Sequence, residues 1–416
     1  MAILEKLKTK RKVTGSSGKS SEPKKRKANG NGKEDHHHEA STGYTLREDC
    51  FRVLSEDNTI PPKDDLGLSK DQVLGFYRNM SRTRALDERG MMLQRQGRIG
   101  FYLPSYGQEA IQTGTAAAIE NTDWVFSSYR EQGVFLMRGA SPYHMICNLY
   151  GNADDLCKGR QMPVHYSFPE LKLFSVSSPI ATQVIQAVGA AMAAKVRGEK
   201  TVAITYFGDG GSSENDTHTG LTFAGAYKAP TVFICTNNGY AISVPIRKQC
   251  GTQRLVEKAA GYGMPGIAVD GNDVFAVYQV TKEAVERARR GEGPTFIECV
   301  THRMGPHSSS DDPTRYRDEK LYDWWKKRDP ILLLREYLTR KKWWSDAEET
   351  RLQEALKREL IEAVEKAEAQ PMPDVDTMFS DVYAELTPQL ERQREALRRE
   401  QDLRGKFENT SEAFPL

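Results

Sequence analysis

The most constraining feature of the sequence is a pair of polar turns, each of which directly follows an apolar, β-branched run. Residues 201–207 lead into Gly-Asp-Gly-Gly at 208–211, and residues 230–236 lead into Asn-Asn-Gly at 237–239. The residues between the turns, 213–227, predict a helix. Short apolar runs on either side of a helix are typical of a strand–helix–strand unit with parallel strands. We therefore expect both turns at the carboxyl edge of one sheet, where open α/β sheets bind ligands.

The alternation of strands and helices continues on both sides of this unit. Apolar residues at helical spacing predict a helix over 68–96, with Gly97 as its stop. Further along the chain, the patterns predict a strand at 267–269, a helix at 273–290 and a strand at 295–301. This order is typical of a doubly wound α/β fold, which has a parallel sheet with helices on both faces.

Composition narrows the class of protein. The chain has 416 residues, of which 38% are hydrophobic and 28% charged, as in ordinary globular proteins. No apolar run reaches the roughly 18 residues that a membrane-spanning helix needs, so we expect no membrane partner. The six cysteines are scattered, with no CxxC pair and no His at metal-ligand spacing. This pattern favours reduced thiols in an intracellular protein over a disulfide framework or a zinc site.

Local composition divides the chain into three regions. Residues 1–43 contain eleven Lys or Arg against five acidic residues and no aromatic residue, which predicts a disordered basic tail. A solvated tail is favoured over a nucleic-acid-binding arm, because no aromatics are interleaved, and no nucleic-acid partner is expected. Residues 44–330 are expected to form the α/β domain. Residues 331–416 predict a charged helical extension, in which Ser345 and Glu348 read as a capping box.

The residue types in the two turns fit one kind of ligand. The carboxylate of Asp209 and the amide oxygen of Asn238 are hard ligands, but Mg²⁺ requires about six oxygens, which phosphates and water can complete. Glycines let the backbone approach an anion closely, and the start of the following helix favours negative charge. The spacing matches neither GxGxxG nor the P-loop. The pair of turns therefore predicts a site for Mg²⁺ and a diphosphate.

The two turns, with 26 residues between Gly210 and Asn237, resemble the thiamine diphosphate signature of 2-oxo acid decarboxylating enzymes. Other segments resemble the alpha subunit of the E1 component of 2-oxo acid dehydrogenases, in chain order: SSYREQG at 127–133, YGN at 150–152, GRQMPVHY at 159–166, VDGND at 269–273 and SSDD at 309–312. The stretch 161–166 and the pair Asp311-Asp312 resemble the branched-chain 2-oxo acid form more than the pyruvate form. The likeness extends from about residue 44 to about residue 397.

This resemblance implies the thiamine diphosphate-binding fold and a set of cofactor ligands. The side chains of Asp209 and Asn238 and the main-chain carbonyl of Tyr240 are implied to bind Mg²⁺. The diphosphate is implied to lie against three glycines and a phosphate clamp, the latter because a guanidinium fork suits phosphate oxygens. These residues are Gly208, Gly210, Gly211, Tyr129 and Arg130.

A segment before the first turn is implied to contact the cofactor as well. Ser178 and Ile180 match a Ser-Pro-Leu segment that holds the cofactor bent, and packing in the core is the alternative role for Ile180. A possible K⁺ site of the branched-chain form coincides with Ser177, Thr182 and Gln183. The Ala- and Gly-rich helix expected at 181–194 suits the close approach of a partner helix.

His307 matches the active-site histidine of the family, which can donate to the diphosphate or move a proton during acyl transfer. Ser308 stands where mitochondrial relatives are phosphorylated. Thr236 departs from the branched-chain pattern, which usually has Arg at this position. We expect Arg247 or Lys248 to supply the missing positive charge.

No second set of strand-ending motifs follows residue 330, so we expect the chain to be catalytically incomplete on its own. A second domain normally carries the Glu that protonates the cofactor's pyrimidine ring. The resemblance implies that a separate beta subunit supplies it in an alpha2beta2 heterotetramer, with a lipoyl-bearing E2 acyltransferase as a further partner. The implied activity is oxidative decarboxylation of branched-chain 2-oxo acids, with acyl transfer to the lipoyl group of E2. A pyruvate or acetoin dehydrogenase is the alternative.

The basic tail bears on location. It is rich in Lys and contains acidic residues, whereas mitochondrial presequences are Arg-rich and poor in acids. We therefore expect a cytoplasmic, bacterial-type location, with the mitochondrial matrix as the alternative. Two rival classes stay open at this point: a non-catalytic binding protein with a nucleic-acid-binding arm, and a decarboxylase that needs no partner.

Overall fold

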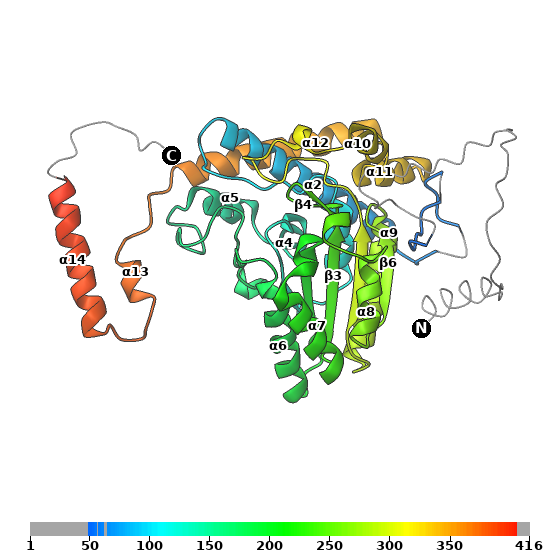
Figure 1. The fold of residues 1–416 in the computed structure, drawn as a ribbon. Coiled ribbons are helices and arrows are strands. Elements are labelled where there is room, and N and C mark those ends of the chain that lie inside the picture. Colours follow the sequence, from blue (N-terminus) through cyan, green and yellow to red (C-terminus); the bar gives the residue numbers. More distant parts are fainter. Residues whose placement is uncertain (1–48, 56, 62–64, 406–416) are drawn as a thin grey trace, which may run out of the picture.

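The structure, a computed structural model, describes residues 49–55, 57–61 and 65–405 (Figure 1). At its centre lies a five-stranded sheet in which every pair of neighbours is parallel. In spatial order the strands are β1 (Trp124–Phe126), β2 (Ala203–Gly208), β3 (Thr231–Asn237), β7 (Thr295–Val300) and β6 (Gly266–Asp270). Because β2, β3 and β7 are neighbours, the residues that follow them meet at one edge of the sheet.

The central strands are buried on both faces. Every residue of β3 and of β7 is buried. Successive side chains point to opposite faces, so Val232 and Ile234 of β3 belong to one hydrophobic core, while Phe233 and Cys235 belong to another. Burial on both faces explains why these strands read as continuous apolar runs in the sequence.

Helices cover both faces of the sheet. On one side, α6 (Thr182–Val196) and α7 (Asn215–Tyr227) share a core with the strands, and on the other side lie α2 (Lys70–Arg95), α3 (Glu109–Ala117) and α9 (Val274–Arg289). Polar caps fix the starts of two of them. Ser69 forms a capping box with Gln72 before α2, and Asp273 accepts two backbone N–H groups at the start of α9.

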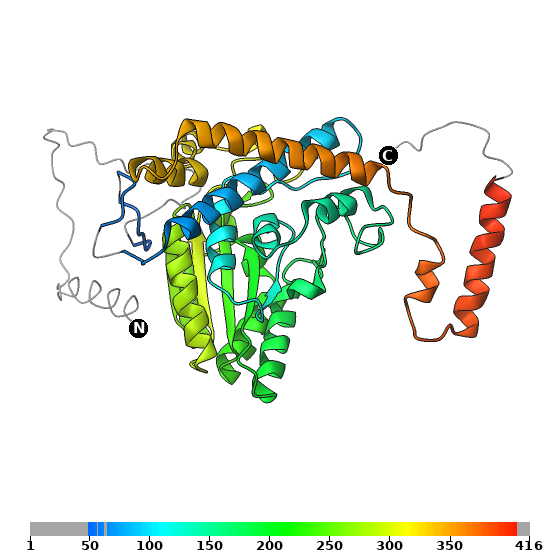
Figure 2. The same cartoon turned by 180° about the vertical axis from the view of Figure 1, so that it is seen from behind.

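The remaining helices lie around this framework. They are α4 (Gln132–Met137), α5 (Pro142–Tyr150), α8 (Lys258–Gly261), α10 (Glu319–Lys326), α11 (Pro330–Arg340) and α12 (Asp346–Glu368). The long helix α12 runs beside α2 and also contacts α5 (Figure 2). Of the two last helices, α13 (Thr377–Ser380) is tied to the body by Arg160, which donates to the Thr377 carbonyl at 2.5 Å, while α14 (Pro388–Gly405) stands away from it (Figure 1). We call residues 371–405 the arm; near its base Asp381 pairs with Lys158 and Arg160.

The predicted doubly wound α/β fold is confirmed, and so is the strand–helix–strand unit of 201–236. The helix expected from 213 begins at Asn215, because Gly210–Ser213 form a 3-10 turn instead. Helices after the sheet begin with α10 at Glu319, before the expected boundary at 331. The basic tail of residues 1–43 lies outside the described residues, and the domain boundaries stay predictions. No helix in the described part of the chain has the length and apolar character to cross a membrane.

Candidate cofactor site at the carboxyl edge of the sheet

The two polar turns come together as the sequence predicts. In the parallel register Gly208 lies opposite Thr236, so the turn after β2 and the turn after β3 start side by side. The Asp209 carboxylate lies close enough to the main-chain amide of Asn238 for that N–H to lower its pKa. A Cβ added to Gly210 would lie 2.7 Å from the Cβ of Ala241, so the segments after the two strands are also in close contact.

Asp209 is a buried carboxylate of this edge with an incomplete set of hydrogen bonds. Its residue is 1% exposed, and its Oδ2 has no hydrogen-bond partner. Burial raises the pKa of Asp209 to about 7, against the opposing effect of the nearby Arg303 guanidinium. A buried carboxylate without a full set of partners is costly to ionise, and a bound cation would remove that cost. The orphaned oxygen therefore fits a metal ligand.

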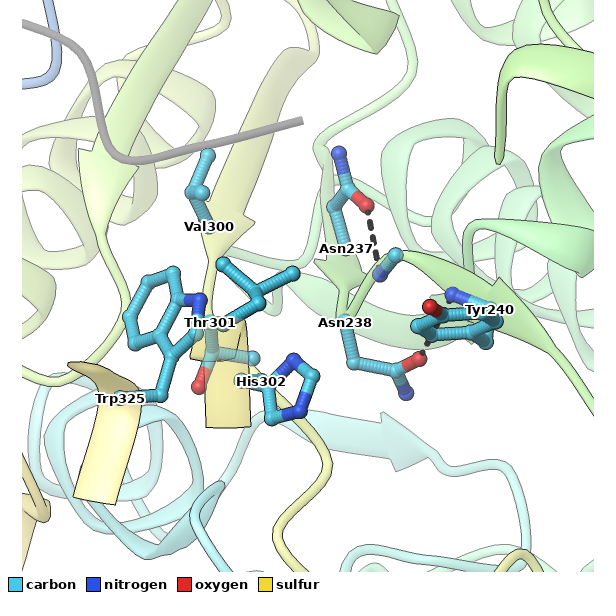
Figure 3. Close-up of a pocket in the computed structure, with 9 residues that line it drawn as sticks. Asn237, Asn238, Tyr240, Val300, Thr301, His302 and Trp325 are labelled. Carbon is cyan, nitrogen blue, oxygen red and sulfur yellow. Dashed lines mark hydrogen bonds between the residues drawn. The ribbon is translucent and has the colours of Figure 1, made fainter. Parts of the chain in front are cut away.

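The second turn uses its two asparagines differently (Figure 3). Asn237 is occupied on both sides: its Nδ2 donates to Glu298 at 2.7 Å, and its Oδ1 accepts from the Gly239 N–H at 3.1 Å. Asn238 accepts only the Tyr240 N–H, at 3.2 Å, and its side chain lines a small cavity together with His302 and Tyr240. Asn237 thus shapes the turn, while Asn238, whose main-chain N–H lies near the Asp209 carboxylate, has a side-chain oxygen with a single donor that a metal can use.

A buried arginine connects this turn to the loop that carries His307. Arg303 donates to the carbonyls of Tyr240 at 3.3 Å and Ile242 at 2.6 Å, and also to the Tyr316 hydroxyl at 2.8 Å. Tyr316 in turn donates to Asp311 Oδ2 at 2.5 Å, and the same oxygen accepts the His307 N–H at 2.7 Å. The carbonyl of Tyr240, implied to bind Mg²⁺, accepts from Arg303 in this structure.

The three residues Tyr129, Arg130 and His307 form one cluster. Arg130 contacts His307 twice, with Nη2 3.2 Å from the ring Nδ1 and 2.8 Å from the main-chain oxygen. The Tyr129 ring lies edge-on to the His307 ring at 6.0 Å. Burial, with Arg130 and Arg303 adding to it, lowers the pKa of His307 to about 3. The imidazole is therefore neutral at physiological pH. One ring nitrogen can accept a proton or a hydrogen bond, and the other can donate a hydrogen bond to an anion.

The segment expected to contact the cofactor lies next to the first turn. A Cβ on Gly211 would lie 3.5 Å from Cγ2 of Ile180, and Ile180 itself is 44% exposed. Ser178 is exposed too. Packing of Ile180 in the core, the alternative role, is wrong, because this side chain faces outward beside the glycines. Ser177 and Thr182 are half-buried, and Gln183 is buried with its Nε2 donating to the Tyr206 carbonyl at 2.7 Å.

The three glycines of the first turn differ in the room they have. Around Gly208 the nearest atom to an added Cβ is 3.9 Å away, whereas at Gly211 it is the Phe207 Cβ at 3.2 Å. Gly210 is the tightest, as described above. A side chain at Gly210 would therefore clash, one at Gly211 would fit tightly, and at Gly208 the chain itself leaves space for a side chain or a ligand.

Neither Arg247 nor Lys248, expected to replace the missing Arg at 236, forms a hydrogen bond or ion pair with the described residues of the two turns. Thr236 is buried, whereas Arg247 and Lys248 are exposed in the short 3-10 helix that follows β5 (Val244–Pro245). Arg247 lies near enough to Tyr240 to lower the pKa of that phenol. The cation that acts on Asp209 is Arg303.

Several residues of this edge escape the sequence motifs. Arg303 and His302 follow β7, Glu298 lies on β7 beside Cys235, and Lys258 begins α8. They are distant in sequence from both turns and match no short motif. One signal did exist: β7 is a third strand whose carboxyl end carries polar residues, at Thr301, His302 and Arg303.

Comparison with known proteins defines the class of this chain. Residues 77–376 match the family described as dehydrogenase E1 component. This match covers most of the chain, which therefore belongs to that family, a family of thiamine diphosphate-dependent oxidoreductases. The family membership and the fold expected from the sequence are confirmed.

Within this family, the chain is similar to alpha subunits of 2-oxoisovalerate dehydrogenase. The chain is 45% identical over 351 residues, 84% of this chain and 79% of the relative, to "2-oxoisovalerate dehydrogenase subunit alpha, mitochondrial" of Homo sapiens. It is 42% identical over 351 residues to the protein of the same name from Dictyostelium discoideum, covering 84% and 80% of the two chains. The corresponding alpha 2 subunit of Arabidopsis thaliana is 41% identical over 356 residues, covering 85% and 75%. The resemblance to the branched-chain alpha subunit is thus confirmed.

Proposed function

We propose that this chain is the alpha subunit of a branched-chain 2-oxo acid dehydrogenase E1 component. Its reaction is the thiamine diphosphate-dependent oxidative decarboxylation of a branched-chain 2-oxo acid, with transfer of the acyl group to a lipoyl-bearing E2. The observation that carries the proposal is the orphaned Asp209 oxygen beside the Asn238 turn, in a chain 45% identical to a 2-oxoisovalerate dehydrogenase alpha subunit.

Mg²⁺ is proposed to bind the Asp209 carboxylate, the Asn238 side-chain oxygen and the Tyr240 carbonyl. The donor set supports this assignment, since all three are hard oxygen ligands and diphosphate oxygens and water can complete an octahedron. Arg303 would give up its 3.3 Å contact with the Tyr240 carbonyl when the metal takes that oxygen. K⁺ is proposed at Ser177, Thr182 and Gln183, where the Nε2 of Gln183 is already engaged, leaving its Oε1 for the ion.

The remaining residues of the edge are proposed to hold the diphosphate and to manage protons. When bound, thiamine diphosphate supplies the carbanion chemistry that breaks the carbon–carbon bond. Arg130 and Tyr129 would clamp phosphate oxygens, and Gly208, Gly210 and Gly211 would present main-chain N–H groups. His307, neutral and held by Arg130, would donate to the diphosphate or move a proton during acyl transfer. Ser178 and Ile180 would shape the cofactor's bend.

A separate beta subunit is proposed to complete the site. Support comes from the outer face of α6, where Ile185, Gly189, Ala193 and Val196 are exposed at helical spacing. Val196 is 89% exposed and Ile185 37% exposed, so two apolar side chains lie uncovered on this face of the helix. Small residues at 189 and 193 would let a partner helix approach closely. An alpha2beta2 heterotetramer would follow, with E2 binding to that assembly.

Location stays a proposal. The relatives described above carry the word mitochondrial in their names, which favours the mitochondrial matrix. The cytoplasmic location expected from the Lys-rich tail is neither supported nor excluded by these names. Fractionation of the source cells, followed by detection of the chain with an antibody, separates the two.

The decisive experiment uses the full chain purified together with its beta-type partner. Isothermal titration calorimetry should show Mg²⁺-dependent thiamine diphosphate binding that Asp209→Ala lowers at least about 100-fold, because a charged metal ligand is lost. Asp71→Ala, an exposed acid in the first turn of α2, is the matched control and should not change binding. Turnover of 3-methyl-2-oxobutanoate should exceed that of pyruvate. A preference for pyruvate would instead identify the pyruvate or acetoin form.

A further inference from the structure

A short segment, Leu255–Gly261, lies beside both ligand-bearing turns. It consists of the 3-10 helix Leu255–Glu257 and the helix α8. Lys258 at its centre donates to the Ser212 carbonyl at 2.8 Å and to the Ser212 hydroxyl at 3.1 Å. Ser212 Oγ itself donates to the Asp209 carbonyl at 2.7 Å. Lys258 is thereby linked through one residue to the first turn.

The same segment is linked to the second turn through Glu298. This carboxylate is fully buried, with 0% of the residue exposed. Its Oε2 accepts the Val256 N–H at 2.9 Å, and its Oε1 accepts Asn237 Nδ2 at 2.7 Å. Since Asn237 Oδ1 holds the Gly239 N–H, the chain of bonds runs from Val256 to the main chain on either side of Asn238.

The segment is itself firmly seated. Leu255 and Ala259 are almost fully buried in the core on the α6 side of the sheet. A Cβ on Gly266 of β6 would lie 2.6 Å from the Val256 side chain and 2.8 Å from Ala259, so the segment packs directly on that strand. Such packing gives the two links a rigid anchor.

We propose that residues 255–261 act as a brace that sets the distance between the metal ligands Asp209 and Asn238, with Lys258 and Glu298 as its two positioning residues. This inference rests on the proposed function, because it concerns the same metal site. Mg²⁺ demands near-ideal octahedral geometry at about 2.0–2.1 Å, whereas Ca²⁺ accepts longer and irregular arrangements at about 2.3–2.6 Å. A brace of this kind therefore favours Mg²⁺ over Ca²⁺.

The chemistry of Glu298 makes a sharp test possible. Its hydrogen-bond partners, Asn237 Nδ2 and the main-chain N–H groups of Val256 and Leu255, are all donors, so both of its oxygens must accept. Glutamine has the same shape but offers one oxygen and one NH₂ group. In Glu298→Gln, the NH₂ group therefore faces either Asn237 Nδ2 or the Val256 N–H, and the hydrogen bond to that group is lost. Lys258→Met removes the other link while keeping the length of the side chain.

The experiment measures Mg²⁺ and Ca²⁺ affinity by calorimetry in the presence of thiamine diphosphate, on the full chain purified with its beta-type partner. Each variant is expected to weaken Mg²⁺ binding about tenfold, the effect of losing one charge-assisted hydrogen bond. Ca²⁺ binding should change less than about threefold, so that the preference for Mg²⁺ falls. Lys258→Arg should keep the wild-type preference for Mg²⁺, and exposed Glu286→Gln and Lys200→Met should leave it unchanged.

A merely structural role predicts a different pattern: a lower melting temperature, with the affinity for both metals reduced equally or not at all. That result would overturn the brace. If Glu298→Gln does not fold, the Mg²⁺ and Ca²⁺ affinities of Lys258→Met and Lys258→Arg are sufficient to test the brace. Asp209→Ala, measured in parallel, separates the two levels of inference. Loss of binding of both metals in that variant upholds the proposed function whatever the brace variants do, whereas unchanged binding refutes the metal site itself.

Discussion

At the scale of single residues, the site depends on the Asp209 carboxylate, whose ionised form is destabilised by burial. Asp209 is buried at the end of β2, one of its oxygens has no partner, and its pKa is raised to about 7. The usual value is about 3.8, so the folded chain holds a proton that the unfolded chain releases between about pH 4 and pH 7. Without metal, the contribution of this group to stability is therefore lost as pH rises through that window.

This sign gives a testable pH dependence. Asp209→Asn has the same shape but does not titrate, so the metal-free variant should become more stable than the wild type as pH rises from 4 to 8. The difference should reach at most about 4 kcal/mol, the equivalent of three pKa units. Urea unfolding at a series of pH values, without metal or cofactor, measures it. If the difference in unfolding free energy between Asp209→Asn and the wild type is the same at pH 4 and at pH 8, Asp209 ionises freely in the folded chain.

Two neighbouring glycines provide a matched pair. Gly210→Ala places a Cβ 2.7 Å from the Ala241 Cβ, while Gly208→Ala meets nothing closer than 3.9 Å. Because the first contact is far inside van der Waals distance, we expect Gly210→Ala to destabilise the chain by roughly 1–3 kcal/mol. Gly208→Ala should cost less than about 1 kcal/mol. Thermal unfolding monitored by circular dichroism compares the two, and an equal loss in both would contradict the tight contact between the turns.

At the scale of elements, local sequence patterns predict the strands and the turns that follow them, but not the contacts between residues of different strands. The strands expected at 201–207, 230–236 and 295–301 form at 203–208, 231–237 and 295–300, because runs buried on both faces are continuously apolar. Asp209 and Asn238 were found because turns at strand ends carry their own composition. Glu298 meets Asn237 only because β3 and β7 pair with Cys235 opposite Glu298. That register between distant segments leaves no mark in either segment's own sequence.

Arg303 connects two loops that are distant in sequence, the one that contains Tyr240 and Ile242 and the one that contains Tyr316. Its guanidinium binds the carbonyls of Tyr240 and Ile242 on one side and the Tyr316 hydroxyl on the other. Arg303→Lys keeps the charge but loses the planar fork, so one ammonium cannot hold all three acceptors. We expect amide hydrogen exchange to accelerate about tenfold in residues 240–245 and 305–311, and to stay unchanged in β3.

The control for this prediction is Arg290→Lys, at an exposed arginine that pairs with Glu292 after α9. It changes the same chemical group at the surface and should leave exchange in both loops as it is. Faster exchange in only one of the two loops would mean that Arg303 supports that loop without connecting it to the other.

At the scale of the whole molecule, two surfaces are built for contact with something else. The outer face of α6 exposes apolar and small side chains, and the arm exposes Met378 and Tyr383. Exposed apolar side chains of this kind fit the proposal that the chain binds a partner subunit.

Gly189 gives the most direct test of that assembly. It is exposed on α6, and no atom lies within 4 Å of a Cβ added there. Gly189→Leu should therefore leave the chain folded, with a melting temperature equal to or above that of the wild type, since Gly is a poor helix former. A side chain at this position would nevertheless hold a partner helix away. We expect co-purification with the beta-type subunit to fall at least about tenfold, together with thiamine diphosphate binding. Gly75→Leu, at a glycine of α2 that also has open space, is the matched control and should keep both. Normal association of the Gly189→Leu chain would show that the beta subunit binds elsewhere, and would direct attention to the arm.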